Sequence, residues 1–419
     1  MQRRVASNLV WMLAERALQV GAGIGIVAML ARGLGPEGFA HFQYAQAVVY
    51  IAASIALICG GEVVIPRLVA DPAPAAQHRL MAHAFVLRLA GGMLGYLLMC
   101  IFLLVTGQSS AFWIPALILG LAIVVREPFG IITAWTQAHT RNRPNTLFNL
   151  ASLTAKTGLV AVLFATGTRS VPAYAAAFSV EPVIIAILLS SYYLARAPRA
   201  RVSPEPALVR ELFRDGMLFW ASFMLMMASR RVDQLLLKPQ VTLAEFGAYA
   251  AAMQILDNFI VVASILAAGL APIYVYAQPA LERARHNIAK IAAGMTAVGL
   301  AGGATIALCA PWIIHLLYGA AFAPAARVLQ LTALASMLVF ADVGLTLLPV
   351  YLRRPRLVAM KWGLAFVVTI LIDVIAIPRL GVTGAILGYA CANLLSVMFG
   401  ILVWLRCRRP AGAGETACA

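Results

Sequence analysis

Apolar segments of about 20 residues recur along the whole chain and are separated by short polar stretches. A helix of this length crosses a hydrocarbon core of ~30 Å. Lipid offers the backbone no hydrogen-bond partners, so each segment is predicted to be helical. The pattern predicts twelve spans, at residues 7–30, 41–65, 81–105, 112–136, 146–166, 173–195, 214–237, 247–274, 288–310, 327–351, 357–377 and 384–405. The chain is therefore predicted to be an all-α integral membrane protein without a sizeable soluble domain.

Composition and charge agree with this prediction. Hydrophobic residues make up 62% of the chain and charged residues 11%, whereas soluble domains carry about 25% charged residues. The formal net charge of +16 could suggest a nucleic-acid partner, but 19 of the 32 Lys and Arg residues fall in the loops or adjoining span ends on the N-terminal side and 5 in those on the opposite side. By the positive-inside rule both termini are predicted to be cytoplasmic. The basic residues are predicted to attract anionic membrane lipids rather than nucleic acid.

Several kinds of chemistry find no support in the sequence. The six cysteines form no CxxC pair, the six histidines form no HExxH motif, and GxxxxGK[ST] does not occur. We therefore expect no catalytic residues, no metal, no cofactor and no ATP hydrolysis by this chain.

The longest loop, residues 196–213, is rich in Arg and Pro and separates spans six and seven. It predicts an N-terminal six-helix bundle (1–195), a cytoplasmic linker (196–213) and a C-terminal six-helix bundle with a short cytoplasmic tail (214–419). Residues 34–42 also resemble residues 241–249. Six spans return the chain to the same side, so this repeat is parallel, an architecture typical of alternating-access transporters with the substrate between the halves.

Five segments resemble a known family, the O-antigen and exopolysaccharide flippases of the multidrug/oligosaccharidyl-lipid/polysaccharide exporter superfamily. They are Leu30–Phe39 (LARGLGPEGF), Gln137–Arg143, Val232–Leu237 followed by Phe246–Ala252, Pro311–Gly319, and Pro378–Ala385. The resemblance implies a V-shaped pair of bundles in the bacterial cytoplasmic (inner) membrane. It implies transport of an undecaprenyl-diphosphate-linked oligosaccharide to the periplasmic leaflet during polysaccharide biosynthesis, for lipopolysaccharide O-antigen or exopolysaccharide. The polymerase and glycosyltransferases of the same pathway are further expected partners.

Charged residues inside the spans are the candidate site, because a charge at the bilayer centre costs ~2.5–3.5 kcal/mol and normally faces a cavity or a partner. Arginine binds phosphate oxygens bidentately, so the cations are candidates to hold the diphosphate: Arg16, Arg126, Lys156, Arg230 and Arg231. Carboxylates at mid-depth are candidates to bind a coupling proton or sodium ion: Glu15, Glu181, Asp233 and Asp257.

Structural interpretations of the same residues stay open. Arg230 and Asp233 have the i, i+3 spacing of a salt bridge on one helix face. Arg126 and Lys156 could instead form salt bridges with Glu127, Glu181 or Glu15 inside the bundle. Three further charges lie near span ends: Arg88 is expected to extend to the cytoplasmic surface, Lys361 to be interfacial, and Asp373 to be wetted from the outside.

Two other functions compete with the flippase. A cation-coupled multidrug antiporter of the same superfamily would place carboxylates and aromatics in its cavity, and the excess of buried Arg and Lys argues against it. A membrane polysaccharide polymerase or glycosyltransferase would need a large extracytoplasmic loop with catalytic residues, and the loops here are short. We therefore predict a transporter and not an enzyme.

Overall fold

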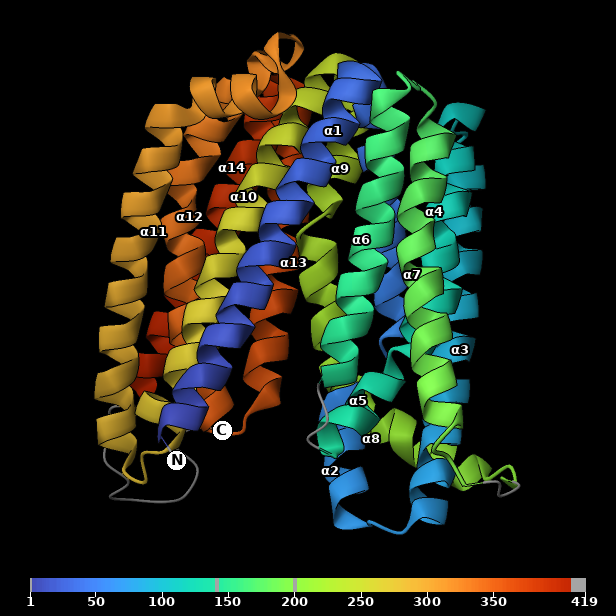
Figure 1. Cartoon of the computed structure of the whole chain (residues 1–419). Coiled ribbons are helices and arrows are strands. Elements are labelled where there is room, and N and C mark those ends of the chain that lie inside the picture. Colours follow the sequence, from blue (N-terminus) through green and yellow to red (C-terminus); the bar gives the residue numbers. More distant parts are fainter. Residues whose placement is uncertain (1, 140–142, 199–201, 408–419) are drawn as a thin grey trace. The chain divides into compact units, whose positions relative to one another are not determined.

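The structure, a computed structural model, describes the backbone of residues 2–139, 143–198 and 202–407, with side chains from Gln19 onward. These ranges are helical and contain no strand (Figure 1). The first half comprises α1 (Gln2–Ala56), α2 (Gly61–Ala70), α3 (Pro74–Val105), α4 (Ser110–Phe129), α5 (Ile131–Ala138), α6 (Arg143–Ala165) and α7 (Val171–Leu194). The second comprises α8 (Pro206–Ser229), α9 (Val232–Leu237), η1 (Lys238–Gln240), α10 (Leu243–Ala271), η2 (Pro272–Tyr276), α11 (Leu281–Tyr318), η3 (Ala320–Phe322), α12 (Pro324–Tyr351), α13 (Pro355–Leu380) and α14 (Val382–Arg406).

Ten helical stretches in the described chain are long and apolar enough to cross a membrane. Residues 19–30 of predicted span one and the whole of predicted span two fall within one of these stretches, Gln19–Ala70, because α1 continues through Gly35. Gly35 has φ 70° and precedes Pro36, so it separates two helical segments. Predicted span seven is missing from the ten: α8 is charged in its first half and ends at Ser229, and a new helix begins at Val232.

The predicted parallel repeat is visible in how the helices end. Gly107 and Gly319 follow α3 and α11, and Gly167 and Gly381 follow α6 and α13. All four have positive φ, which glycine adopts without steric cost. Both pairs are separated by about 210 residues, close to half the chain, as expected of one bundle repeated in the same orientation. The second half therefore repeats the helix order of the first, and the repeat is confirmed.

The described residues group into two compact units. The first unit is the described part of Gly33–Arg231, and the second unit is the described part of Met1–Arg32 together with that of Val232–Ala419. Compared with the predicted domains 1–195 and 214–419, the part of α1 up to Arg32 groups with the second unit, and residues 214–229 of α8 group with the first. The predicted domains describe which helices move together in transport, and that division stays a prediction.

Hydrogen bonds explain this grouping. The Arg32 guanidinium donates to the carbonyl oxygens of Leu316 (2.6 Å) and Leu317 (3.0 Å) at the end of α11, which attaches the first part of α1 to the second unit. The indole N–H of Trp220 donates to the Ser54 carbonyl (3.0 Å), which attaches α8 to the first unit. Carbonyl oxygens in the last turn of a helix lack the usual intrahelical donor and can accept from a side chain elsewhere; the Ser54 carbonyl also accepts from the Leu57 backbone N–H.

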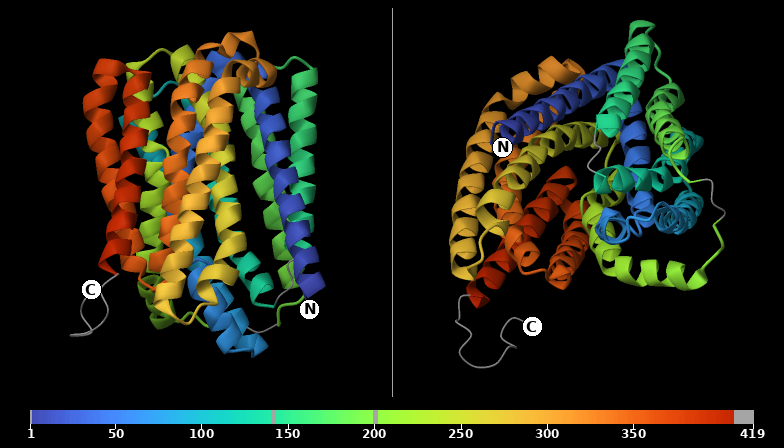
Figure 2. Two further views of the ribbon diagram at one scale, coloured as in Figure 1. Left: turned by 90° about the vertical axis from the view of Figure 1, so that its left-hand side faces the viewer. Right: turned by 60° about the horizontal axis from the view of Figure 1, so that its bottom comes forward.

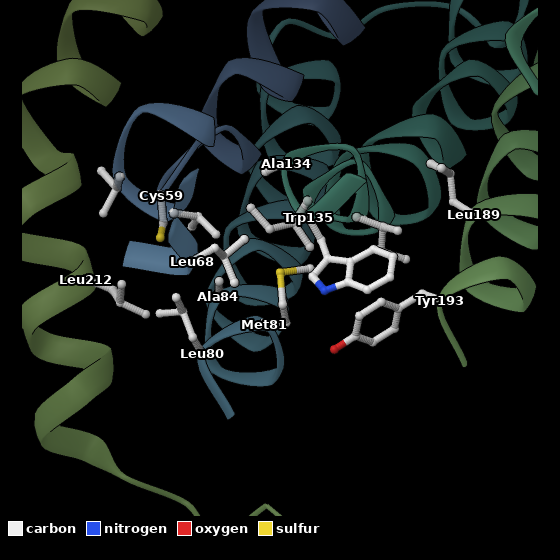
Figure 3. Close-up of a cluster of buried hydrophobic side chains, with 14 of the residues drawn as sticks. Cys59, Leu68, Leu80, Met81, Ala84, Ala134, Trp135, Leu189, Tyr193 and Leu212 are labelled. Atoms are coloured by element: carbon white, nitrogen blue, oxygen red, sulfur yellow. The ribbon is translucent and has the colours of Figure 1, made fainter. Parts of the chain in front are cut away.

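A cluster of buried apolar side chains closes one end of the first unit (Figure 3). Trp135 of α5 lies among them, with its ring 5.3 Å from that of Tyr193 of α7 in an edge-to-face arrangement. The other labelled members come from α2, α3, α5, α7, α8 and the loop before α2: Cys59, Leu68, Leu80, Met81, Ala84, Ala134, Leu189 and Leu212. Aromatic side chains bury large areas and pair with fixed geometry, so this cluster holds the short helices α2 and α5 against the longer ones.

Glycines bring α11 and α12 of the second unit together, and both views of Figure 2 show these helices side by side. A Cβ atom at Gly303 would lie 2.3 Å from the Ala333 carbonyl oxygen, and one at Gly344 would lie 2.7 Å from the Ala292 Cα. Small residues are used in this way at helix interfaces within membranes. Large apolar side chains such as Leu308, which is 82% exposed, cover the outer surface, as a surface in contact with lipid requires.

Candidate functional site

Two aspartates and two tyrosines from four helices of the second unit form an acidic cluster. Asp233 comes from α9, Tyr249 from α10, Asp373 from α13 and Tyr389 from α14. The Tyr249 hydroxyl donates to an Asp233 carboxylate oxygen. Asp233 is 5% exposed and Asp373 is 0% exposed, and each lies close enough to act on the other electrostatically.

Asp373 was expected to be wetted, and this expectation was wrong. Neither of its carboxylate oxygens has a hydrogen-bond partner in the part of the chain that the structure describes. A Cβ atom at Gly388 would overlap the carboxylate, so the absence of a side chain there makes room for it. A dry pair of carboxylates is stable when it binds a cation or shares a proton, which makes this cluster a candidate ion site.

Lys361 and Asp342 form a buried ion pair in the second unit. The Lys361 Nζ lies 2.8 Å and 3.0 Å from the two Asp342 carboxylate oxygens and donates to the Thr346 hydroxyl at 2.8 Å. The two charged side chains are 5% and 7% exposed. Lys361 was predicted to be interfacial, which was wrong, because α12 carries Asp342 to a position opposite α13.

Lys156 of α6 and Glu181 of α7 form an ion pair in the first unit. Their side chains are 14% and 18% exposed, and the Lys156 ammonium lies 5.2 Å from the centre of the Phe178 ring. The structure therefore shows the arrangement in which Lys156 forms an ion pair with Glu181 inside the bundle. A direct role of either residue in transport stays a prediction.

Arg230 and Arg231 occupy the break between α8 and α9 and are half-buried. The Arg231 guanidinium lies 5.3 Å from the centre of the Tyr50 ring. Helix breaks at membrane depth are tolerated where they line a cavity or protein. The predicted pairing of Arg230 with Asp233 crosses the boundary between the two units and stays a prediction.

The remaining candidates are Asp257, Glu15, Arg16 and Arg126. Asp257 is half-buried in α10. The side chains of Glu15 and Arg16, which belong to α1, lie outside the described residues. Arg126, at the end of α4, lines a cavity of about 380 Å³ in the first unit. Arg88 also lines this cavity and is only 7% exposed, so the prediction that it extends to the surface was wrong.

The helix order, the repeat and the ten apolar stretches define an all-helical, multi-pass membrane protein with an alternating-access fold. An inward-facing multidrug resistance MATE family transporter of the MOP superfamily is similar over 94% of this chain and 96% of its own, with 14% identity and a TM-score of 0.74. The lipid II flippase MurJ is similar over 94% and 87%, with 11% identity and a TM-score of 0.73. A MOP superfamily transporter from Pyrococcus furiosus is similar over 94% and 96%, with 14% identity and a TM-score of 0.58. At these identities the likeness concerns the fold.

The family follows from the sequence. The family model described as "Polysaccharide biosynthesis protein" matches residues 5–275, which is more than half of the chain. The chain therefore belongs to this family, and the assignment predicted from its motifs is confirmed. A search of curated proteins found no match.

Proposed function

We propose that this protein is a flippase that moves an undecaprenyl-diphosphate-linked oligosaccharide from the cytoplasmic to the periplasmic leaflet of the bacterial inner membrane. It would act during O-antigen or exopolysaccharide synthesis, beside the glycosyltransferases that make the substrate and the polymerase that consumes it. Family membership supports the pathway. The observation that carries the proposal is the pair Arg230 and Arg231, set into the break between α8 and α9.

The diphosphate is the part of such a substrate that these arginines would recognise. A guanidinium donates two parallel hydrogen bonds to a phosphoryl group, which gives both affinity and orientation. Arg16 and Arg126 are the further cations proposed to contact the diphosphate, whereas Lys156 would first have to leave Glu181.

Alanine variants of Arg16, Arg230 and Arg231 test this proposal. Each should abolish or strongly reduce glycan export while the protein still inserts at normal levels, because a hydrogen bond to a charged group is worth ~1.5–3 kcal/mol, or one to two decades in affinity. Lysine should restore part of the export, since it keeps the charge but not the planar fork. Arg169→Ala, an exposed loop change, is the control for loss of one positive charge.

The salt-bridge interpretation makes a different forecast for Arg230. If this side chain only neutralises Asp233, removal of both should be nearly neutral, whereas removal of one leaves a buried charge unpaired. We expect the double variant Arg230→Ala with Asp233→Ala to be expressed normally and to export no glycan. Normal export by this double variant would refute both the substrate role of Arg230 and the ion-binding role that we propose below for Asp233.

We also propose that transport is coupled to a proton or sodium ion bound by Asp233 together with Asp373. The support is the burial of both carboxylates and the lack of a hydrogen-bond partner for Asp373 among the described residues. Asp257 and Glu15 are the other candidates, and Glu181 is engaged by Lys156. In proteoliposomes, an imposed sodium or pH gradient should accelerate transport by the wild type, and Asp373→Asn should abolish that response. An unchanged response in Asp373→Asn would exclude this site.

The same acidic cluster is the specific observation that favours a cation-coupled multidrug antiporter as the second candidate function. The two functions differ in the phenotype of a deletion strain. Loss of a flippase should cause lipid-linked oligosaccharide to accumulate, whereas loss of an antiporter should change drug tolerance. The excess of cations over carboxylates at the helix break and in the cavity of the first unit supports the flippase.

A further inference from the structure

The cavity of about 380 Å³ lies inside the first unit, between α2, α3, α4, α5, α6 and α7. Its volume is within the range of about 300–1,000 Å³ that small-molecule sites occupy. Its polar lining consists of two guanidiniums, one carboxylate, one hydroxyl and two amides. These groups belong to Arg88, Arg126, Glu127, Thr133, Gln137 and Asn149.

Arg88 is the unusual member of this lining. It is 7% exposed, and it makes no hydrogen bond or ion pair with any residue that the structure describes. Glu127 and Glu62 act on it electrostatically, but neither approaches within ion-pair distance. Its Nη1 lies beside Gly130, where α4 ends and α5 begins. A buried charge is normally paired or hydrogen-bonded, because the loss of hydration is otherwise uncompensated.

The missing partner should be an anion. Arg88 and Arg126 bring two guanidiniums to the cavity against the single carboxylate of Glu127. Each guanidinium carries five N–H donors in a planar fork, and the amides of Gln137 and Asn149 add donors that a carboxylate-lined cation site would not need. A phosphoryl group has several oxygens arranged around one centre, so it can accept from donors on different walls of the cavity.

Packing holds two walls of the cavity in place. Ala134 and Leu189 line the cavity and also belong to the apolar cluster of Figure 3, which includes Trp135 and Tyr193. The cluster fixes α5 and α7, which form two of the cavity walls. A site whose walls are already ordered loses little conformational entropy when it binds.

The cavity lies near the basic end of the first unit. Asn149 is six residues into α6, which corresponds to ~9 Å along the helix. The same end of the unit contains α2 and the start of α8, with Arg67 and Arg79 near it (Figure 1). The positive-inside rule predicts that this end is cytoplasmic, the side from which a lipid-linked substrate would be loaded.

We propose that this cavity is a binding site for a phosphoryl anion, with Arg88 and Arg126 as its cationic ligands. The anion has two sources, the diphosphate headgroup of the lipid-linked substrate or free phosphate and diphosphate from the cytoplasm. The lipid source rests on the proposed flippase function, whereas binding of the free anions does not depend on it. Arg88 is thus assigned a role that its position in the sequence did not indicate.

Thermal unfolding of the purified full-length protein in uncharged detergent and phosphate-free buffer tests the site. One titration uses inorganic phosphate and inorganic diphosphate, and a second uses a polyprenyl diphosphate with the corresponding polyprenol as the control lipid. We expect the polyprenyl diphosphate, the inorganic diphosphate or both to raise the unfolding temperature of the wild type in a saturable manner. Arg88→Met should weaken the apparent affinity about 10- to 100-fold.

Arg88→Met should itself be at least as stable as the wild type without anion, because it replaces an unpaired buried charge by an apolar chain of similar length. Arg79→Met, which removes an exposed charge at the same end, should respond to the anion like the wild type. A response to the polyprenyl diphosphate alone identifies the lipid headgroup, and a response to inorganic diphosphate as well identifies a site open to free anions.

Either of two results would overturn the proposal: no saturable response in the wild type, or a full response in Arg88→Met. Glycan export by the wild-type gene is measured separately in cells. If export fails but Arg88-dependent anion binding is found, the flippase assignment is wrong and the site remains. If export is normal but the anions do not bind, only the site is wrong.

Discussion

Removal of Lys361 should be one of the most destabilising single changes in the second unit. All three N–H donors of its ammonium are used, two by the Asp342 carboxylate at 2.8 Å and 3.0 Å and one by Thr346 at 2.8 Å. Lys361→Met keeps most of the side-chain volume and leaves Asp342 as an unpaired buried carboxylate, 7% exposed. Removal of one partner of such a pair costs about 3–5 kcal/mol.

The double variant provides the internal comparison. Lys361→Met with Asp342→Leu removes both charges, and replacement of a buried pair by apolar residues is often neutral or stabilising. The second substitution should therefore restore most of the stability that the first removes. For a unit of about 200 residues, 1 kcal/mol shifts the unfolding temperature by roughly 2–4 °C. The single variant should therefore unfold roughly 6–20 °C below the wild type, and the double variant near it.

The assay is thermal unfolding of detergent-purified wild type, both single variants and the double variant, analysed as a double-mutant cycle. Expression and monodispersity of each variant are checked first. If the effects of the two single changes simply add in the double variant, Lys361 and Asp342 are energetically independent. The burial argument would then be refuted for this pair.

Three further outcomes are expected. Gly303→Val should strongly reduce the yield of folded, monodisperse protein, because its Cβ would lie 2.3 Å from a backbone oxygen of α12. Gly294→Val on the same helix should fold normally, because a Cβ atom there has no neighbouring atom within 4 Å. Equal yields of the two variants would argue against close α11–α12 packing. Arg67→Ala should change stability by less than about 1 kcal/mol, since its partners are half-exposed, and a larger loss in thermal unfolding would contradict this. A reporter fused after Arg409 should be cytoplasmic and one inserted after Gly107 periplasmic; a periplasmic C-terminus would require an odd number of spans.

The sequence alone determined the membrane class, the helical content, the parallel repeat and the family. These properties depend on local features: the length of an apolar segment, the glycines and prolines that end it, and the side on which loop arginines fall. Gly35 illustrates this, because a glycine followed by a proline interrupts a helix whatever surrounds it. The candidate cations and carboxylates were also found by a local criterion, a charge within an apolar run.

The partners of those charges were decided only by the tertiary structure. A charge near a span end faces water, a helix or a cavity according to which helix packs beside it, and that neighbour is distant in the sequence. Lys361 and Asp373 looked alike as charges near span ends, yet Lys361 is paired across α12 and α13 while both oxygens of Asp373 lack a partner in the described chain. Arg88 looked like a surface arginine and is buried, because α4, α5 and α7 enclose a cavity around it. Burial and pairing depend on long-range packing, and hydrophobic periodicity along one chain contains no information about which helices meet.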